Sequence, residues 1–377
     1  AATATFTGRI PAYPTGAGLT HGSFQAGTVN LENPLAAYDV LPRQRRDSLY
    51  VALAQDLTPG VSLSADARAT RRRFTNRSVA SSPTLTVNRS NPYFVSPTGQ
   101  TSERIAYSFL NELGGQRVNG VADTLGLSFG GQARLPGTWR LDAYGAYGLE
   151  QGRSRTDNLV NTSYLSEALG TTANNAATPF NTAVNGFFNP FIGQGSNPKA
   201  ILDFISGGYL TRKTRGETAS ANLKLDGELF TLPAGAVGLA VGGQVRREAL
   251  KTGGVSLTSG FAPTEVARRD VHRTIDAAFA EVRVPIFGGG FVRPGLQRLE
   301  LSAAVRREDY GQIASTDPKV GVIWSPAAGL TVKGRYGTSF RAPALIELNE
   351  PQIYAPTTLT RNGQDTIVMI LYGGNLD

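Results

Sequence analysis

Cysteine is absent from the 377-residue chain, and histidine occurs only twice, at His21 and His272. The first absence excludes disulfides and thiolate metal sites, and two distant histidines argue against a metal site built on imidazole. We therefore expect no resident metal and no cofactor. The motif HExxH and a phosphate-binding loop are missing as well, and no catalytic residue is assigned.

Long hydrophobic runs are also missing. The longest, around residues 232–243, is broken by glycines and falls short of the roughly 18 residues that a membrane helix needs. The N-terminus, AATATFTGRI, has no basic segment followed by an apolar core, which argues against a signal peptide. The chain is then either cytosolic or a mature or truncated form. With 40% hydrophobic and 18% charged residues, it is too apolar for disorder.

The formal net charge is +8, which raises the question of an acidic partner. The basic residues do not gather on one stripe, however. They recur singly within alternating segments and often close to an acid, as with Arg140 and Asp142 or Lys224 and Asp226. This distribution favours a polar lumen, and we expect no nucleic-acid partner.

The most informative stretch is 329–343, GLTVKGRYGTSFRAP. Leu330, Val332 and Tyr336 share one parity, and Lys333 and Arg335 share the other. Because successive side chains of a strand point to opposite faces, this pattern predicts a strand with one apolar and one charged face. A solvated edge of a β-sandwich is the alternative reading.

The same alternation recurs along the chain and predicts about ten strands. Short turns alternate with long connections, of which 73–104 and 152–208 are the longest, and a mid-length loop runs to about His272. One short helix is expected at 198–205, capped by Ser196 or Asn197. Residues 1–47 and those after Pro343 lack periodicity. The expected strands are 49–57, 61–72, 124–134, 139–150, 219–226, 237–246, 278–284, 298–306, 320–324 and 330–342.

The two tryptophans carry a second, independent signal. Trp139 opens a strand just after a short turn, and Trp324 ends one just before a short turn. Both have the parity of the apolar face, which predicts an interfacial girdle at one membrane surface, because indole is apolar but its N–H needs a wet partner. Ordinary core positions are the alternative.

Together these patterns predict an all-β fold, an antiparallel transmembrane β-barrel with long extracellular loops and short periplasmic turns. Ten strands are too few to close around so large a polar face, and an open edge in lipid leaves unpaired backbone groups. We therefore expect residues 1–377 to be part of a larger barrel.

The stretch from Gly334 to Pro343, followed by Glu347 and Leu348, resembles the YG-x-SFRAP-x-x-x-EL segment of TonB-dependent outer-membrane receptors. The final GGNLD is similar to the start of the family's GGNPDLKPE segment, although Leu376 stands where proline is usual. The motif residues are Ser339, Phe340, Arg341, Ala342, Pro343 and Glu347.

The resemblance implies the barrel portion of a 22-stranded receptor whose plug domain and C-terminal strands are absent here. It implies TonB-energised uptake of a scarce ligand, such as a ferric siderophore, haem, cobalamin or an oligosaccharide, with any iron arriving already chelated. The implied partners are outer-membrane lipid, TonB through the missing plug, and the ligand. A passive porin is the alternative function; an outer-membrane protease or phospholipase and an adhesive β-solenoid fit less well.

Ligand contact is expected from aromatic loop residues and from arginines of the lumen, since loops on a rigid scaffold carry specificity. Strand parity places Phe340 outward, in an upper aromatic belt, and Arg341 inward. The candidate ligand-binding residues are Tyr93, Phe94, Phe187, Phe188, Phe191, Arg335 and Arg341.

Overall fold

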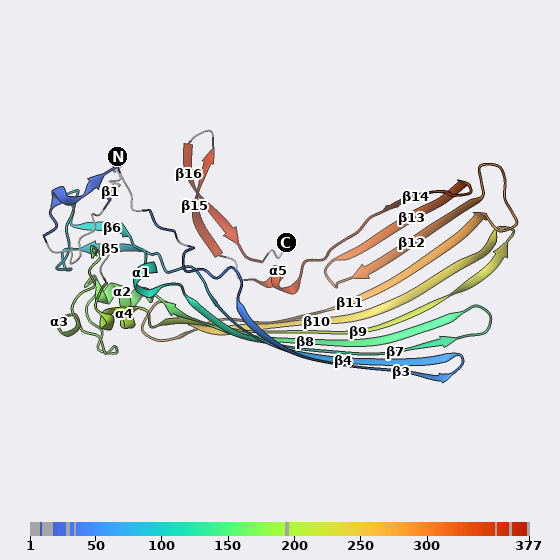
Figure 1. The fold of residues 1–377 in the computed structure, drawn as a ribbon, viewed down its shortest axis with the longest axis horizontal. Coiled ribbons are helices and arrows are strands. Elements are labelled where there is room, and N and C mark those ends of the chain that lie inside the picture. Colours follow the sequence, from blue (N-terminus) through green and yellow to red (C-terminus); the bar gives the residue numbers. More distant parts are fainter. Residues whose placement is uncertain are drawn as a thin grey trace.

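The computed structural model describes residues 8–9, 18–27, 31–33, 35–192, 196–350, 353–361 and 364–374. Its main feature is one antiparallel sheet of ten strands, in the order β14-β13-β12-β11-β10-β9-β8-β7-β4-β3 (Figure 1). The expected all-β architecture is confirmed. The strands are β3 (Arg43–Thr58), β4 (Val61–Arg77), β7 (Arg117–Arg134), β8 (Arg140–Leu159), β9 (Gly208–Leu232), β10 (Gly235–Leu257), β11 (Thr264–Phe287), β12 (Arg298–Asp309), β13 (Ala314–Ala327) and β14 (Leu330–Gly337).

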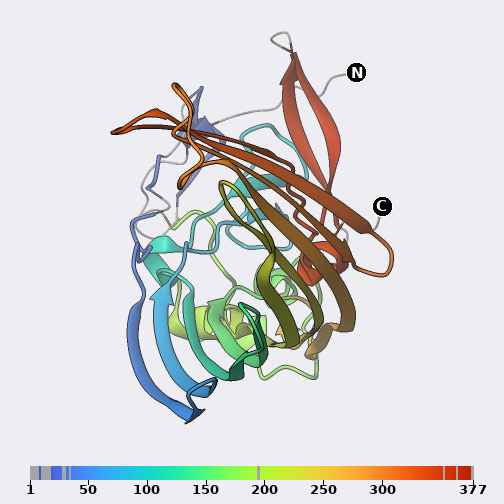
Figure 2. The same ribbon diagram turned by 90° about the vertical axis from the view of Figure 1, so that its right-hand side faces the viewer.

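Seen from the end where the short turns lie, the sheet curves into an open trough (Figure 2). β3 and β14 form its two edges and are not paired with each other, so the barrel is not closed. No helix in the described part of the chain combines the length and apolar character needed to cross a membrane.

The two faces of the sheet differ as the alternation predicts. Along β12, odd-numbered residues from Leu301 to Asp309 are exposed, whereas the even-numbered residues between them are half-buried. Leu49 and Leu53 on β3 are each 66% exposed. The leucines and valines therefore cover the convex outer face, and the half-buried polar residues line the concave side.

Substitution on the outer face tests this assignment. Val305→Arg is expected to destabilise the protein by about 2–4 kcal/mol if Val305 lies near the bilayer midplane, because an arginine there must be taken into hydrocarbon. The neighbouring Ala304→Arg places the same side chain on the concave face and is the matched control. Unfolding titrations in lipid vesicles measure the difference; equal losses for the two variants would contradict the assignment.

Three large rings lie against glycines on adjacent strands. A Cβ built on Gly120, Gly227 or Gly242 would come within 3.0 Å of the ring of Phe74, Trp139 or Phe279, respectively. At the turn end, Trp324 donates its indole N–H to the carbonyl oxygen of Gly295 at 2.8 Å. Both tryptophans thus lie at the same end of the sheet, as the girdle prediction requires, and membrane contact stays a prediction.

Several strands are longer than their hydrophobic alternation. The expected mid-length loop before His272 is wrong: β10 and β11 pair without interruption from Gly238 and Arg283 out to Thr252 and Arg269. Polar residues occupy both faces of this outer part, so alternation of hydrophobicity vanishes although the backbone ladder continues. Loop lengths at the two ends are therefore less segregated than the sequence indicated.

The long connections pack together into a loop domain beyond the sheet. It contains the hairpin β5 (Thr84–Asn88) and β6 (Ser102–Ala106), and the helices α1 (Leu110–Leu113), α2 (Thr162–Ala168), α3 (Thr182–Asn185) and α4 (Lys199–Ile205). The buried hydrophobic cluster of the molecule lies here, with Val87, Phe109, Phe188, Ile201 and Ile205 each 0% exposed. The core is thus in the loops and not between sheet faces.

The expected helix at 198–205 is confirmed as α4, but its expected cap is wrong. Pro198 occupies the N-cap position and makes no side-chain cap. The Asn197 side chain instead accepts a hydrogen bond from the Asn189 backbone N–H at 2.7 Å and donates to Glu112 at 2.9 Å. It therefore joins loops rather than capping the helix.

Neither end of the chain is wholly irregular. After β14 come α5 (Leu345–Asn349) and the hairpin of β15 (Ile353–Arg361) and β16 (Gln364–Tyr372). Near the N-terminus, β1 (Gly8–Arg9) pairs with β2 (Gln25–Ala26), next to the single-turn η1 (His21–Ser23). The segment resembling GGNPDLKPE falls largely on residues 375–377, which lie outside the described residues.

Candidate functional site

The concave face carries two groups of charged side chains at different heights. The group nearer the turn end lies where β8 and β9 pair Arg140 with Asp226 and Asp142 with Lys224. The Lys224 ammonium is 3.0 Å from a carboxylate oxygen of each aspartate. The charges that would be costly in lipid are thus paired with each other, beside a hollow of about 500 Å³.

The second group lies nearer the loops and holds the segment after β14, the C-terminal arm (residues 338–350). Arg273 of β11 binds Glu248 of β10 at 2.7 Å and donates to the Pro343 carbonyl oxygen at 2.7 Å. Its guanidinium lies over the ring of Tyr310, which meets Phe340 edge-on at 6.1 Å. The SFRAP motif is therefore docked on the lumen wall.

Two hydrogen bonds to the Glu347 carboxylate stabilise the arm from within. Glu347 accepts hydrogen bonds from the Ala344 backbone N–H at 2.6 Å and from Arg341 at 2.8 Å. These two donors stabilise the carboxylate, and they hold the pKa of Glu347 below its ordinary value of 4.5. The spacing from Arg341 to Glu347 thus has a local structural role: it closes the turn before α5.

The two hydrogen bonds of Glu347 predict that the stability of the arm depends on pH. A lowered folded-state pKa means that the stabilisation is present above the unfolded value near 4.5 and is lost as the pH falls through the folded value. Hydrogen exchange of residues 345–349 should therefore accelerate on acidification below about pH 4.5, beyond the intrinsic change. Glu347→Gln should exchange faster at neutral pH and lose that acid-dependent step. An unchanged profile in the variant would assign the step to another group.

A hollow of about 990 Å³ lies between the arm and the wall. Strand residues including Glu150, Arg246 and Glu248 line one side, and Phe340, Arg341 and Ile346 line the other. The prediction that Phe340 faces outward is wrong, because β14 ends at Gly337 and strand parity does not extend to position 340. Arg341 reaches this hollow as expected; Arg335 lies on β14, opposite Gly321.

The aromatic loop candidates divide into two groups. Phe188 and Phe191 are 0% and 2% exposed and pack inside the loop domain, so they are not at loop tips. Phe187 is half-buried with its ring against Gly170, and Tyr93 and Phe94 are partly buried against the hydrophobic cluster. Ligand contact by these three and by the two lumen arginines stays a prediction.

Two segments of the chain, 91–93 and 189–191, share the pattern Asn-Pro-aromatic and have a structural role. Asn91 is buried, and its amide donates to the carbonyl oxygens of Leu169 and Phe188 at 3.1 and 2.9 Å. The Asn91 side chain also accepts a hydrogen bond from the Tyr93 backbone N–H, and the Asn189 side chain accepts one from the Phe191 backbone N–H. The segments therefore join loops that are far apart in the sequence.

Sequence reasoning missed several polar groups that hold the loops. Glu112 accepts from the backbone N–H of Asn197 at 2.7 Å and from the hydroxyl of Tyr107 at 2.7 Å. Burial raises the pKa of that hydroxyl, and the nearby carboxylate raises it further. Glu167 is fully buried and accepts from Asn175 and Thr178. No period or motif marked them, since their partners are up to 85 residues away.

Across the described ranges, no three His, Cys, Asp or Glu side chains group in a way that could hold a metal ion. The charged groups of the lumen wall form pairs that position the arm and line the two hollows.

Comparisons with known proteins agree with this architecture. A family model described as "TonB dependent receptor-like, beta-barrel" matches residues 84–377. Among solved structures, the RagAB peptide transporter is similar at a TM-score of 0.51 and 11% identity, over 89% of this chain and 37% of that one. The RagAB peptide importer in its "open-open" state is similar at a TM-score of 0.50 and 10% identity, over 89% of this chain and 36% of that one. The chain thus spans little more than a third of these neighbours. No curated protein matches it.

Proposed function

Because the chain belongs to the TonB-dependent receptor β-barrel family, whose members lie in the outer membrane, we propose that it forms part of the barrel of an active outer-membrane importer. The supporting observation is the division of its sheet into an apolar outer face and a paired, charged lumen face against which the SFRAP arm is docked. The proposal assigns the chain no catalytic step.

In this proposal, residues 1–377 supply about ten strands of a larger barrel, the remaining strands and a plug belong to the whole receptor, and TonB supplies the energy. The cargo is a scarce solute too large for passive pores: a metal chelate, haem, cobalamin, an oligosaccharide or, in view of what the RagAB structures are said to transport, a peptide. The hollow under the arm, at about 990 Å³, has room for part of such a cargo.

Uptake measurements on a deletion strain test the proposal. Loss of the receptor should abolish uptake of one of these solutes at low external concentration, and inactivating TonB should have the same effect. Uptake that survives TonB inactivation and rises linearly with solute concentration would favour the passive-porin alternative. A deletion strain with every such uptake rate unchanged would refute the transport role itself.

A further inference from the structure

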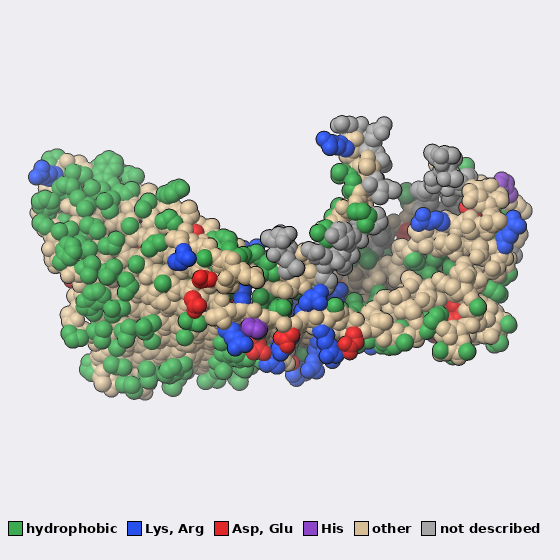
Figure 3. Space-filling view, turned by 180° about the vertical axis from the view of Figure 1, so that it is seen from behind, with side chains coloured by type: hydrophobic (Ala, Val, Ile, Leu, Met, Phe, Trp, Pro, Cys, Tyr) green, Lys and Arg blue, Asp and Glu red, His purple; other side chains and the backbone are tan. Residues whose placement is uncertain are grey.

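The outer face of the sheet changes character where the apolar band ends. On β4 the outward residues change from Ala67 and Ala69 to Arg71 and Arg73, and on β8 Leu149 gives way to Arg153. Figure 3 shows the result from behind: hydrophobic side chains cover the turn end, and Lys and Arg side chains with fewer acids gather over the middle of the strands.

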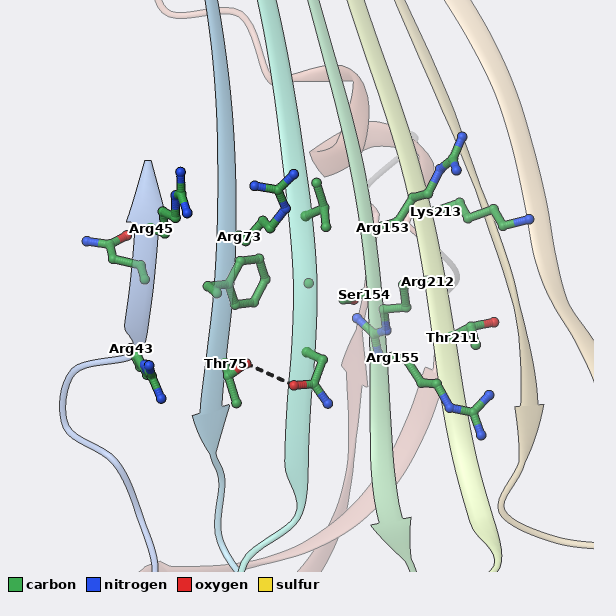
Figure 4. Close-up of a pocket in the computed structure, with 15 residues that line it drawn as sticks. Arg43, Arg45, Arg73, Thr75, Arg153, Ser154, Arg155, Thr211, Arg212 and Lys213 are labelled. Atoms are coloured by element: carbon green, nitrogen blue, oxygen red, sulfur yellow. Dashed lines mark hydrogen bonds between the residues drawn. The ribbon is translucent and has the colours of Figure 1, made fainter. Parts of the chain in front are cut away.

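Strand pairing aligns these cations across the sheet. Arg45 lies opposite Arg73, and Arg153 lies opposite Lys213, with Val121 of β7 between Arg73 and Arg153. Figure 4 shows Arg45, Arg73, Arg153 and Lys213 at one level across the strands. We call these four residues the basic belt. Like charges directly opposite each other on paired strands are destabilising, so the belt calls for counter-charge.

The protein itself supplies only part of that counter-charge: Asp123 of β7 lies beside the belt, but its carboxylate is bound to Arg71 at 2.7 Å. Asp47 lies 3.1 Å from Arg45 and 3.4 Å from Arg73, and both contacts are to this one carboxylate. Among the described residues, Arg153 and Lys213 have no acid within ion-pair distance. A hollow of about 790 Å³ runs along the belt, and a second of about 450 Å³ continues past Lys213 to Lys251 and Arg268.

We propose that the basic belt binds the phosphate groups of lipid headgroups in the leaflet on the loop side of the membrane. Headgroups begin where the hydrocarbon ends, and the belt lies beyond the apolar band on the same face, past one row of residues that includes Asp47, Arg71 and Asp123. Arginine and lysine form charge-assisted hydrogen bonds with phosphate, and basic residues at a membrane surface add to lipid affinity.

Charge complementarity and position favour lipid over a protein partner. A protein interface of this size has aromatic or aliphatic anchors at its centre with charges at the rim. In the described structure, no large apolar side chain beside the belt is strongly exposed; Val121, which lies between Arg73 and Arg153, is half-buried. The belt also follows the apolar band across neighbouring strands instead of forming a compact patch.

The test uses the full-length receptor, purified in detergent, and two matched variants. The belt variant carries Arg45→Gln, Arg73→Gln, Arg153→Gln and Lys213→Gln. The control carries Arg72→Gln and Arg212→Gln, which lie on β4 and β9 next to belt residues but face the lumen. The probes are mixed micelles containing lipid A, which bears phosphate monoesters, its dephosphorylated form, or phosphatidylcholine alone.

Each basic residue at a charged surface is worth about fivefold, so the belt variant, which lacks four of them, should bind lipid A roughly 600-fold more weakly. The lumen variant should bind like wild type, and wild type should lose affinity on dephosphorylation of the lipid and at high salt. Circular dichroism and heat-modifiable gel mobility check that both variants are folded. Equal binding by the belt variant, or equal binding to the dephosphorylated lipid, would overturn the proposal. Capture of an acidic protein by wild type but not by the belt variant, without any effect on lipid A, would assign the belt to protein instead.

Discussion

Replacing Phe188 by alanine is expected to lower the local stability of the loop domain by about 3–5 kcal/mol. The ring is 0% exposed and packs against Tyr107 at 5.3 Å and Phe109 at 5.6 Å. Truncation leaves a cavity inside the buried hydrophobic cluster that joins these loops. Hydrogen exchange of α2 and α4, which belong to the same cluster, measures the loss as a smaller free energy of local opening.

The neighbouring Phe187→Ala is the matched control. Phe187 is only half-buried, so its loss should leave exchange in α2 and α4 nearly unchanged. If Phe187 contacts the ligand, the control variant should bind ligand more weakly while remaining as stable as wild type. Similar exchange rates in the two variants would show that Phe188 does not hold the loop domain together.

Arg273→Gln is expected to release the C-terminal arm. The Arg273 side chain is 14% exposed and joins Glu248 to the Pro343 carbonyl oxygen. Removing one partner of a half-buried ion pair leaves the other uncompensated and costs about 3 kcal/mol. Hydrogen exchange should increase in residues 338–349, and the strands near the turns should keep their protection.

A double-mutant cycle separates the ion pair from the arm contact. Glu248→Gln alone should also destabilise, whereas the double variant with Arg273→Gln should recover about 1–3 kcal/mol of the summed loss. The arm should remain loose in the double variant, because the donor to Pro343 is still missing. Strict additivity of the two substitutions would mean that the pair is not coupled.

The sheet could be predicted from the sequence because each strand near the turns has to satisfy lipid on one side and water on the other. That requirement produces the alternation of apolar and polar residues seen in 299–305 and in 49–57. The outer halves of the strands meet water on both faces, so Arg247 and Lys251 carry no such period, and the expected loop at this point proved to be strand.

The contacts of the loops and of the C-terminal arm were less predictable for a different reason. Arg273 meets Pro343 across 70 residues, and Asn91 meets Phe188 across 97. Such contacts depend on which loops fold over one another. A local sequence pattern does not indicate which distant loops will meet. Phe188 and Phe191 stand in a long connection and look like exposed loop aromatics, yet their burial comes from distant segments. Phe340 was placed on the wrong face because the strand ends three residues before it.

The rings lying on Gly120, Gly227 and Gly242 have a consequence for assembly. Inside a bilayer, hydrophobicity alone does not distinguish the correct register of two paired strands from a register shifted by two residues. Both registers keep the apolar side chains on the outer face. A bulky ring that fits only over a residue lacking a side chain does make that distinction. Three such sites, on separate strand pairs, would therefore disfavour shifted strand registers while the sheet assembles in the membrane.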